Sequence, residues 1–544
     1  MTKVEDPQVE RVENAGAKLR PELDEMQGRA IQQQEHNRGY LETLRRDPKL
    51  LFWIGVMLWA LIVRGFEGTA AGTVISIPAF KERFGKYEAS TGSYYIETSW
   101  QSALSGGGNA SAIAGAWIAS FLSDVIGLKP VLIGAAALNI ASVGIEFATT
   151  SVQMFFAGKV VNYVAIGALL NLCTAYVAEI SPLAIRASVI GFCNLSQCIG
   201  PFIAALMAYR TEKWTTDWSW KSLICTQWGF GVVAFIALLF MPESPVYLVK
   251  KGQLAAARQS LGRLYSDPQD ADGHLVRIQL TLEEAETQNT GSYLECFRGT
   301  NRRRTLIAIM CFLAEGMSGL GFVSSYGALM YEYLGISSSK SFRIQIGAQI
   351  LSMSGATISF LVGDLYGRRP MYLGGCVCLC ILLLCMGISG SVNTAAATTA
   401  SVGFYAMFNF FYNAGVGSNV YAIAGEVPTS ALRTKTIAIA ITCSSASNTM
   451  WSFTAPYMFN PGYGDLKARI GFVFGSFMFI WAILGFLFVP ETRLRTYEEL
   501  DELFMNHVPA REFRKYVTVA ETRAAEAFTI EHKSKAIELE EECV

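Results

Sequence analysis

Long apolar segments alternate with shorter polar segments over most of the chain. Twelve of the apolar segments have about 20 residues or more, the length that a helix needs to cross a bilayer. They cover residues 51–78, 97–122, 129–149, 153–178, 187–208, 222–241, 303–333, 343–363, 370–390, 398–424, 435–456 and 470–489. The first segment follows a long hydrophilic stretch, so we do not expect it to be a cleavable signal peptide. The pattern predicts an all-α membrane protein with twelve transmembrane helices.

One long polar segment divides these helices into two sets of six. We expect five regions: an N-terminal tail at 1–50, a six-helix bundle at 51–241, a central loop at 242–302, a second six-helix bundle at 303–489 and a C-terminal tail at 490–544. An even number of spans places both tails on one side of the membrane. If that side is the cytoplasm, its loops and span-flanking residues carry nineteen Lys and Arg, against ten in the outer loops. This excess of positive charge predicts cytoplasmic tails.

Composition supports a membrane protein and excludes several function classes. Hydrophobic residues make up 51% of the chain and charged residues 16%, whereas soluble proteins carry roughly 25% charged residues. The net charge of −1 does not indicate a nucleic-acid partner. The four histidines lie in the tails or the central loop, so no His-based catalytic or metal site is expected within the membrane. We expect neither an enzyme nor a bound cofactor or metal.

The two halves of the chain repeat three charged motifs in the same order. "SDVIGLK" (123–129) matches "GDLYGRR" (363–369), "EISPLAIR" (179–186) matches "EVPTSALR" (426–433), and "PES" (242–244) matches "PET" (490–492). The offsets are 240, 247 and 248 residues, which indicates an internal duplication. Parallel repeats of six-helix bundles are typical of transporters that rock around a site between the repeats.

Two interpretations of these motifs remain open. The charged loops could simply cap helix ends and fix the topology. Alternatively, they could form a conformational latch whose ion pairs break when the bundles separate on one side, each pair changing the balance by roughly 1–3 kcal/mol. We favour the latch because acid and base recur at the same spacing. Its predicted members are Asp124, Lys129, Glu179, Arg186, Glu243, Asp364, Arg368, Arg369, Glu426, Arg433 and Glu491.

Charged residues also occur inside the apolar segments. "LIVRGFEGTAAGTVIS" (61–76) places Arg64 and Glu67 within the first span, and Glu315 lies within the seventh. An ionisable residue at membrane depth costs about 2.5–3.5 kcal/mol on insertion scales, which indicates a functional role. The alternative for Glu67 is a static ion pair with Arg64, one helical turn away. We favour a functional role for Glu67 over the static pair, and a role in substrate or proton binding for Glu315.

The repeated motifs resemble those of the sugar porter family of the major facilitator superfamily. The resemblance covers about residues 51–504 and includes "PESPVYLVKKG" (242–252), "DLYGRRP" (364–370) and "VPETRLRTYEELDELF" (489–504). "PAFKERFG" (78–85) and "PYMFNPG" (456–462) look most like the fungal α-glucoside (maltose-type) permeases. The family fold implies two six-helix bundles around a central cavity, with helical segments in the cytoplasmic loop.

The resemblance implies roles for individual residues. The family's proton-coupling carboxylate of span 1 falls on Glu67, and its basic partner in span 4 falls on Lys159. Arg64 is a second candidate partner. Sugar-contacting amides fall on Asn194 in span 5 and Asn448 in span 11, and an aromatic position of span 10 falls on Tyr421. Tyr326 in span 7 is a further candidate for stacking on a sugar ring, although core packing is the simpler interpretation.

Span 7 departs from the family pattern. "EGMSGLG" (315–321) has Glu315 and Gly316 in place of two glutamines, and Gly321 in place of an asparagine. Amides both donate and accept hydrogen bonds, which suits hydroxyl-rich ligands, so their loss weakens the case for a sugar. Glu315 could bind a cationic or hydroxylated ligand, or it could be a second protonatable site.

These observations leave several functions to compare. The leading hypothesis is a proton-coupled importer of an α-glucoside that works by alternating access, as a monomer in the plasma membrane, with the proton gradient as its driving force. The alternative keeps the fold and transports or exports a non-sugar fungal metabolite. A sensor without transport activity ranks third, because its tails of about fifty residues are short for signalling.

Overall fold

The computed structural model describes residues 45–518, apart from 90–91, 289–291, 393, 430–431, 461, 494 and 496. Each of the twelve predicted spans coincides with a helix or with a helix interrupted at one point. This confirms the all-α fold class. Nine of the described helical segments are long and apolar enough to cross a membrane.

The first six spans are formed by nearly continuous helices. They are α3 (Pro48–Ile75), α5 (Thr98–Ser102) continued by the π-helix η1 (Ala103–Gly107) and α6 (Gly108–Ile126), α7 (Leu128–Phe147), α8 (Val152–Ile180), α9 (Leu183–Thr211) and α10 (Trp218–Phe240). Local sequence accounts for several of their ends. Pro48 occupies the first turn of α3, where its missing N–H costs nothing. The Ser151 hydroxyl accepts a hydrogen bond from the Met154 N–H and so caps α8.

The last six spans include two that are interrupted. They are α14 (Gly299–Gly316) with α15 (Leu320–Tyr333), α16 (Ser338–Tyr366), α17 (Arg368–Gly390), α18 (Ala395–Phe411) with the π-helix η3 (Tyr412–Gly417) and α19 (Ser418–Glu426), α20 (Arg433–Phe459) and α21 (Ile470–Phe488). Span 7 breaks at Gly319, whose φ of 92° is a conformation that favours glycine. Discontinuous spans of this kind often line binding sites in transport proteins.

Shorter elements lie outside the spans. The central loop forms α11 (Pro245–Lys250), α12 (Leu254–Leu264), α13 (Pro268–Gln288) and the 3₁₀ turn η2 (Tyr293–Phe297), which confirms that this loop is helical. The others are α4 (Pro78–Phe84), the turn η4 (Lys467–Arg469) and α22 (Tyr497–Met505). The strands β1 (Lys86–Glu88) and β2 (Ser93–Tyr95) pair antiparallel, with Tyr87 opposite Tyr94. The hydrophobic pattern of the sequence did not predict this hairpin.

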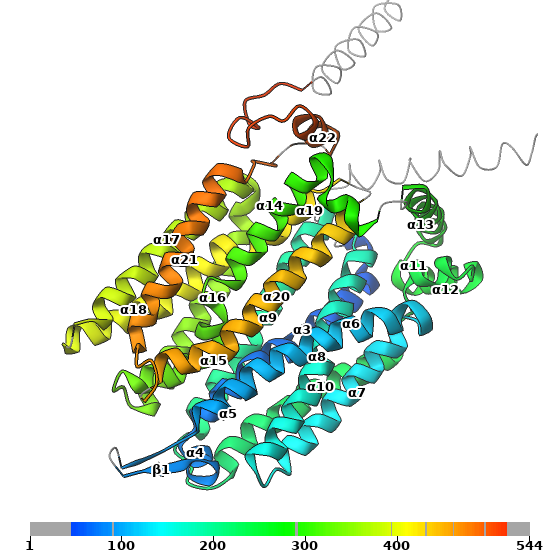
Figure 1. Ribbon diagram of the computed structural model, residues 1–544. Coiled ribbons are helices and arrows are strands. Elements are labelled where there is room, and N and C mark those ends of the chain that lie inside the picture. The colour runs from blue at the N-terminus through cyan, green and yellow to red at the C-terminus, as the bar shows by residue number, and fades with distance from the viewer. Residues whose placement is uncertain are drawn as a thin grey trace, which may run out of the picture. The chain divides into compact units, whose positions relative to one another are not determined.

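The chain divides into two compact units. The described part of unit 1 lies within residues 45–288, 324–332 and 336–349, and that of unit 2 lies within 292–323, 333–335 and 350–518. In unit 1, α3 packs against α8, α9 and α10, and the loop helices lie at the opposite end from β1 (Figure 1). In unit 2, α17 packs against α18 and α21, and α14 packs against α20. The five regions expected from the sequence stay a prediction.

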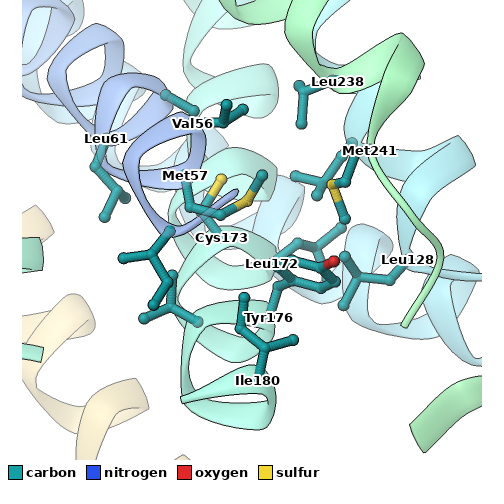
Figure 2. Packing of buried hydrophobic residues seen from close by; sticks show 14 of the residues in the cluster. Val56, Met57, Leu61, Leu128, Leu172, Cys173, Tyr176, Ile180, Leu238 and Met241 are labelled. Carbon is teal, nitrogen blue, oxygen red and sulfur yellow. The ribbon is translucent and has the colours of Figure 1, made fainter. Parts of the chain in front are cut away.

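A buried apolar cluster occupies the loop-helix end of unit 1. Met57 of α3, Cys173 of α8 and Leu238 of α10 belong to this cluster, and each is fully buried (Figure 2). Tyr176 lies beside them, and its hydroxyl donates a hydrogen bond to the Pro242 carbonyl at 3.2 Å. The cluster therefore joins spans 1, 4 and 6 to the start of the central loop.

The outer faces of several helices expose large apolar side chains. Phe121 of α6 is 71% exposed and Phe240 of α10 is 70% exposed. Trp117, Ile381 and Phe479 on α6, α17 and α21 are also exposed. Extensive apolar surface of this kind is unfavourable in water and suits contact with lipid chains.

Candidate functional site

Glu67 lies at the centre of a buried charged cluster in unit 1. Its carboxylate, on α3, accepts a hydrogen bond from Lys159 Nζ of α8 at 2.6 Å. Gln227 Nε2 of α10 donates to the other carboxylate oxygen at 2.9 Å. Glu67 is 0% exposed and Lys159 is 1% exposed, so both are removed from solvent. Spans 1, 4 and 6 therefore supply one acid, one base and one amide to a single site.

The structure pairs Glu67 with Lys159, one of the two bases suggested by the sequence. No ion pair joins Arg64 to Glu67 in the described part of the chain, and Arg64 is only partly buried. The Arg64 guanidinium lies beside Gly68, where a Cβ atom would be 3.5 Å from Arg64 Nη1. The geometry therefore disagrees with the static Arg64–Glu67 pair as the explanation for these charges.

A second carboxylate, not predicted from the sequence, contacts the same lysine. Glu146 of α7 lies 2.9 Å from Lys159 Nζ and is 0% exposed. Asn162 Nδ2 donates to Glu146 at 2.9 Å, and Asn139 Nδ2 donates to Asn162 at 2.6 Å. Glu146 lies in the predicted span 129–149, so the argument applied to Glu67, that an acid at membrane depth is functional, could have identified it.

In unit 2, Glu315 lies where span 7 breaks. It is the penultimate residue of α14 and is 8% exposed. The Tyr412 hydroxyl of η3 donates to Glu315 Oε1 at 3.2 Å. π-helical segments such as η3 are frequent at functional sites because they redirect side chains. The structure thus places the main departure from the family pattern beside a polar group of span 10.

The remaining span 7 departure leaves space beside Asn448. A Cβ atom at Gly321 would lie 3.6 Å from Asn448 Oδ1 and 3.4 Å from Ser452 Oγ, both of α20. Asn448 Oδ1 is buried and accepts no hydrogen bond from the residues that the structure describes. An amide oxygen in this position could accept a hydrogen bond from a ligand hydroxyl.

The other predicted substrate residues have different surroundings. Tyr421 of α19 is 51% exposed and its ring packs edge-on against Phe312 at 4.9 Å. Asn194 is partly buried on α9 of unit 1. Tyr326 is fully buried in unit 1, where its hydroxyl donates to the Gln101 carbonyl at 3.1 Å. That contact favours a packing role for Tyr326, the simpler of the two interpretations.

The duplicated motifs have similar geometry in both units. Gly127 and Gly367, with φ of 101° and 98°, precede α7 and α17. Glu243 accepts hydrogen bonds from the Leu128 and Lys129 N–H groups, both at 3.0 Å, and Glu491 accepts one from the Arg368 N–H at 3.1 Å. Each carboxylate therefore caps the first turn of the helix that follows the glycine.

Other predicted latch residues make contacts within their own unit. Asp124 pairs with Lys250 at 3.1 Å on the surface, and the Ser244 hydroxyl donates to Glu179 at 2.5 Å. Arg368 Nε lies 3.4 Å from Glu426, and Arg369 Nη2 donates to the Phe486 carbonyl at 2.8 Å. Arg433 begins α20. The side chains of Arg186 and Asp364 lie outside the described residues, and the latch itself stays a prediction.

The central loop is held together by ion pairs outside the spans. Arg258 Nε of α12 donates to Asp272 of α13 at 2.5 Å, and this hydrogen bond raises the pKa of the guanidinium above its usual value. Arg46 Nη2 lies 3.2 Å from Asp267 and 2.8 Å from Asp270. These contacts tie the loop helices to one another and to the residues before α3.

Comparisons with known proteins agree with this architecture. Residues 53–504 match the family described as sugar (and other) transporters. The maltose permease MAL31 of Saccharomyces cerevisiae is 30% identical over 506 residues, which cover 90% of this chain and 82% of the permease. The general alpha-glucoside permease of the same yeast is 28% identical over 488 residues, which cover 88% of this chain and 78% of the permease.

Solved structures share the fold. The xylose transporter XylE from E. coli, in a partially occluded inward-open conformation, has a TM-score of 0.68 and 17% identity, and the match covers 82% of this chain and 99% of XylE. The proton:xylose symporter XylE bound to 6-bromo-6-deoxy-D-glucose has a TM-score of 0.67 and 19% identity, covering 84% and 100%. With the family match over most of its length, this chain belongs to the sugar (and other) transporter family of multi-pass membrane transporters, which are not enzymes.

Proposed function

We propose that this protein imports an α-glucoside and couples its entry to the movement of a proton. The observation that carries the proposal is the buried ion pair between Glu67 and Lys159. Taking a carboxylate and an ammonium out of water costs several kcal/mol per ion, so a fixed pair at this depth would be expensive without a role. The names of the yeast relatives support the substrate class, and the XylE description supports proton coupling.

In this mechanism Glu67 takes up a proton from the outer side when substrate binds. Protonation removes its negative charge and weakens its attraction to Lys159. The balance between the two conformations then shifts, and loss of the proton on the inner side restores the pair. Glu315, Tyr421, Asn194 and Asn448 are the residues we assign to substrate binding. We place the protein in the plasma membrane as a monomer, with both tails in the cytoplasm.

Uptake into proteoliposomes tests the proposal. Purified protein is reconstituted and given labelled maltose, glucose or sucrose, with and without an imposed pH gradient that is acidic outside. We expect accumulation of at least maltose, and only with the gradient. Absence of uptake for all three sugars would refute the sugar substrate. Equal accumulation without a gradient would refute proton coupling.

A second candidate function keeps the mechanism and changes the cargo. Glu315 and Gly316 replace two amides at the break in span 7, and Glu315 is held by the Tyr412 hydroxyl. A carboxylate can bind a cationic or hydroxylated metabolite that an amide pair would bind less tightly. Uptake of a labelled cationic metabolite, lost in Glu315→Gln, in a protein that takes up none of the three sugars would favour this alternative.

A further inference from the structure

We propose that Glu146 is the permanent counterion of Lys159, and that it makes the buried cluster of Glu67, Glu146 and Lys159 hold one exchangeable proton. The role of that proton in uptake rests on the proposed function. The presence of the bound proton is independent of the proposed function, because it follows from the charges of the cluster.

Neighbouring helices provide both the space and the polar contacts that a buried carboxylate at Glu146 needs. Gly158 of α8 leaves room for the side chain, since a Cβ atom there would lie 2.8 Å from Glu146 Cγ. The hydrogen-bonded pair of Asn162 and Asn139 holds one oxygen, and Lys159 Nζ lies 2.9 Å from the other. Asn139 in turn fits beside Gly231, where a Cβ atom would lie 2.9 Å from Asn139 Oδ1.

The charges of the cluster do not balance unless one proton is bound. Two ionised carboxylates and one ammonium give a net charge of −1 in a region without exposed surface. An uncompensated charge in such a region is strongly unfavourable. When one carboxylate oxygen binds a proton and becomes a carboxylic acid, the cluster is neutral. Lys159 then keeps Glu146 as its ionised partner while Glu67 carries the proton.

Other charged groups near the cluster do not replace this proton. On α8, the Tyr163 hydroxyl lies 3.5 Å from the Glu67 carbonyl and is uncharged at neutral pH. Arg64 of α3 and Lys221 of α10 are partly exposed, and Lys221 Nζ lies over the Phe147 ring at 5.1 Å. Residues 108–123 of α6 and 188–209 of α9 include no acid, lysine, arginine or histidine. The balance is therefore set by the three charged residues themselves.

The charge balance predicts that removing one acid abolishes the bound proton, and that removing one acid together with the lysine restores it. Glu67→Gln and Glu146→Gln each leave one acid with Lys159, so either variant is neutral without a bound proton. Glu146→Gln with Lys159→Met leaves Glu67 alone, so this double variant is neutral only with a proton. Glu146→Asp keeps the second carboxylate and serves as the conservative control for folding.

Infrared spectroscopy of the reconstituted protein at neutral pH tests the proposal without any substrate. Other buried acids, such as Glu315, can absorb in the same region, so each variant is compared with the unmodified protein as a difference spectrum. We expect one component of the protonated-carboxyl absorption to be present in the unmodified protein and in Glu146→Asp, lost in Glu67→Gln and Glu146→Gln, and restored in the double variant. Glu332→Gln is the matched control, because Glu332 is mostly buried but already paired with Lys81. It should leave the absorption intact. A difference spectrum of Glu146→Gln that shows no loss of this component would overturn the proposal.

The pH dependence of uptake then tests the use of this proton in transport. Removing the Glu146 charge makes Glu67 release its proton more readily, so uptake by Glu146→Gln should require an outer pH lower by about one unit or more. An unchanged pH profile would overturn the role of Glu146 in transport. If none of the three sugars is taken up, the proposed function is refuted. The infrared experiment still tests whether the cluster binds one proton.

Discussion

At the residue scale, the main result is that one buried lysine contacts two buried carboxylates. Lys159 lies 2.6 Å from Glu67 and 2.9 Å from Glu146, and these three residues come from three different spans. Gln227 fixes the second oxygen of Glu67 by donating a hydrogen bond. The carboxylate can therefore change its protonation state without losing its position.

Glu67→Gln should abolish accumulation of substrate against its gradient while exchange of labelled for unlabelled substrate continues. The amide keeps the shape of the side chain but cannot carry a proton, so binding and conformational change remain and coupling is lost. Counterflow and gradient-driven uptake in the same proteoliposomes measure the two activities separately. Accumulation that equals that of the unmodified protein would show that Glu67 is only a structural partner of Lys159.

At the element scale, helices in unit 1 approach one another through glycines. A Cβ atom at Gly167 of α8 would lie 2.1 Å from the Ala112 carbonyl oxygen of α6, and one at Gly115 would lie 2.1 Å from the Val164 oxygen. These contacts are with backbone atoms, which cannot move aside as a flexible side chain can. Small residues are typical of close helix packing in membranes.

Gly167→Ala should destabilise the protein by about 1–3 kcal/mol, because the added methyl group forces α6 and α8 apart. Gly134→Ala is the matched control, since no atom lies within 4 Å of a Cβ at that position of α7. There the better helix propensity of alanine should be neutral or stabilising by up to about 1 kcal/mol. Thermal unfolding in detergent compares the two variants, and equal melting temperatures would contradict the packing argument.

The helix caps of the duplicated motif can be tested separately from the latch. Glu243→Ala removes the acceptor for the Leu128 and Lys129 N–H groups and should cost about 1–2 kcal/mol of stability. Glu243→Gln keeps an acceptor oxygen and should lose less. Asp124→Asn, at the exposed pair with Lys250, should change stability by less than about 1 kcal/mol. Denaturant unfolding that ranks these variants differently would refute the cap.

At the scale of the whole molecule, the arrangement of the six spans of unit 1 shows which helix ends lie on the same side of the membrane. The loop helices α11 to α13 and the start of α3 lie at one end, and the β1–β2 hairpin lies at the other (Figure 1). The positive charge of the flanking residues predicts that the first end faces the cytoplasm. The hairpin should therefore face the outside.

Labelling of intact cells checks this topology. A cysteine in place of Tyr94, which is 41% exposed on β2, should react with a membrane-impermeant thiol reagent. A cysteine in place of Leu254, which is 43% exposed on α12, should react only after the cells are opened. Each variant is compared with the parent chain, which carries the native cysteines. The reverse pattern would contradict cytoplasmic tails.

Much of the fold could be predicted from the sequence because the relevant signals are local. Runs of apolar residues located all twelve spans, and the repeat of "PES" and "PET" marked two sites that prove to have the same cap geometry. The β1–β2 hairpin was missed because it is short, polar and exposed, so it carries no periodic burial signal.

The candidate site was only half predictable. The sequence by itself identified Glu67 as a charge in an apolar span and offered Lys159 and Arg64 as its partners. Only the tertiary structure selected Lys159, placed Glu146 against it and bonded Tyr326 to the Gln101 carbonyl. The physical reason is that apolar periodicity defines a helix but not its rotation or its neighbours. Those are decided by packing between helices, which here brings residues 92 and 79 positions from Glu67 into one buried cluster.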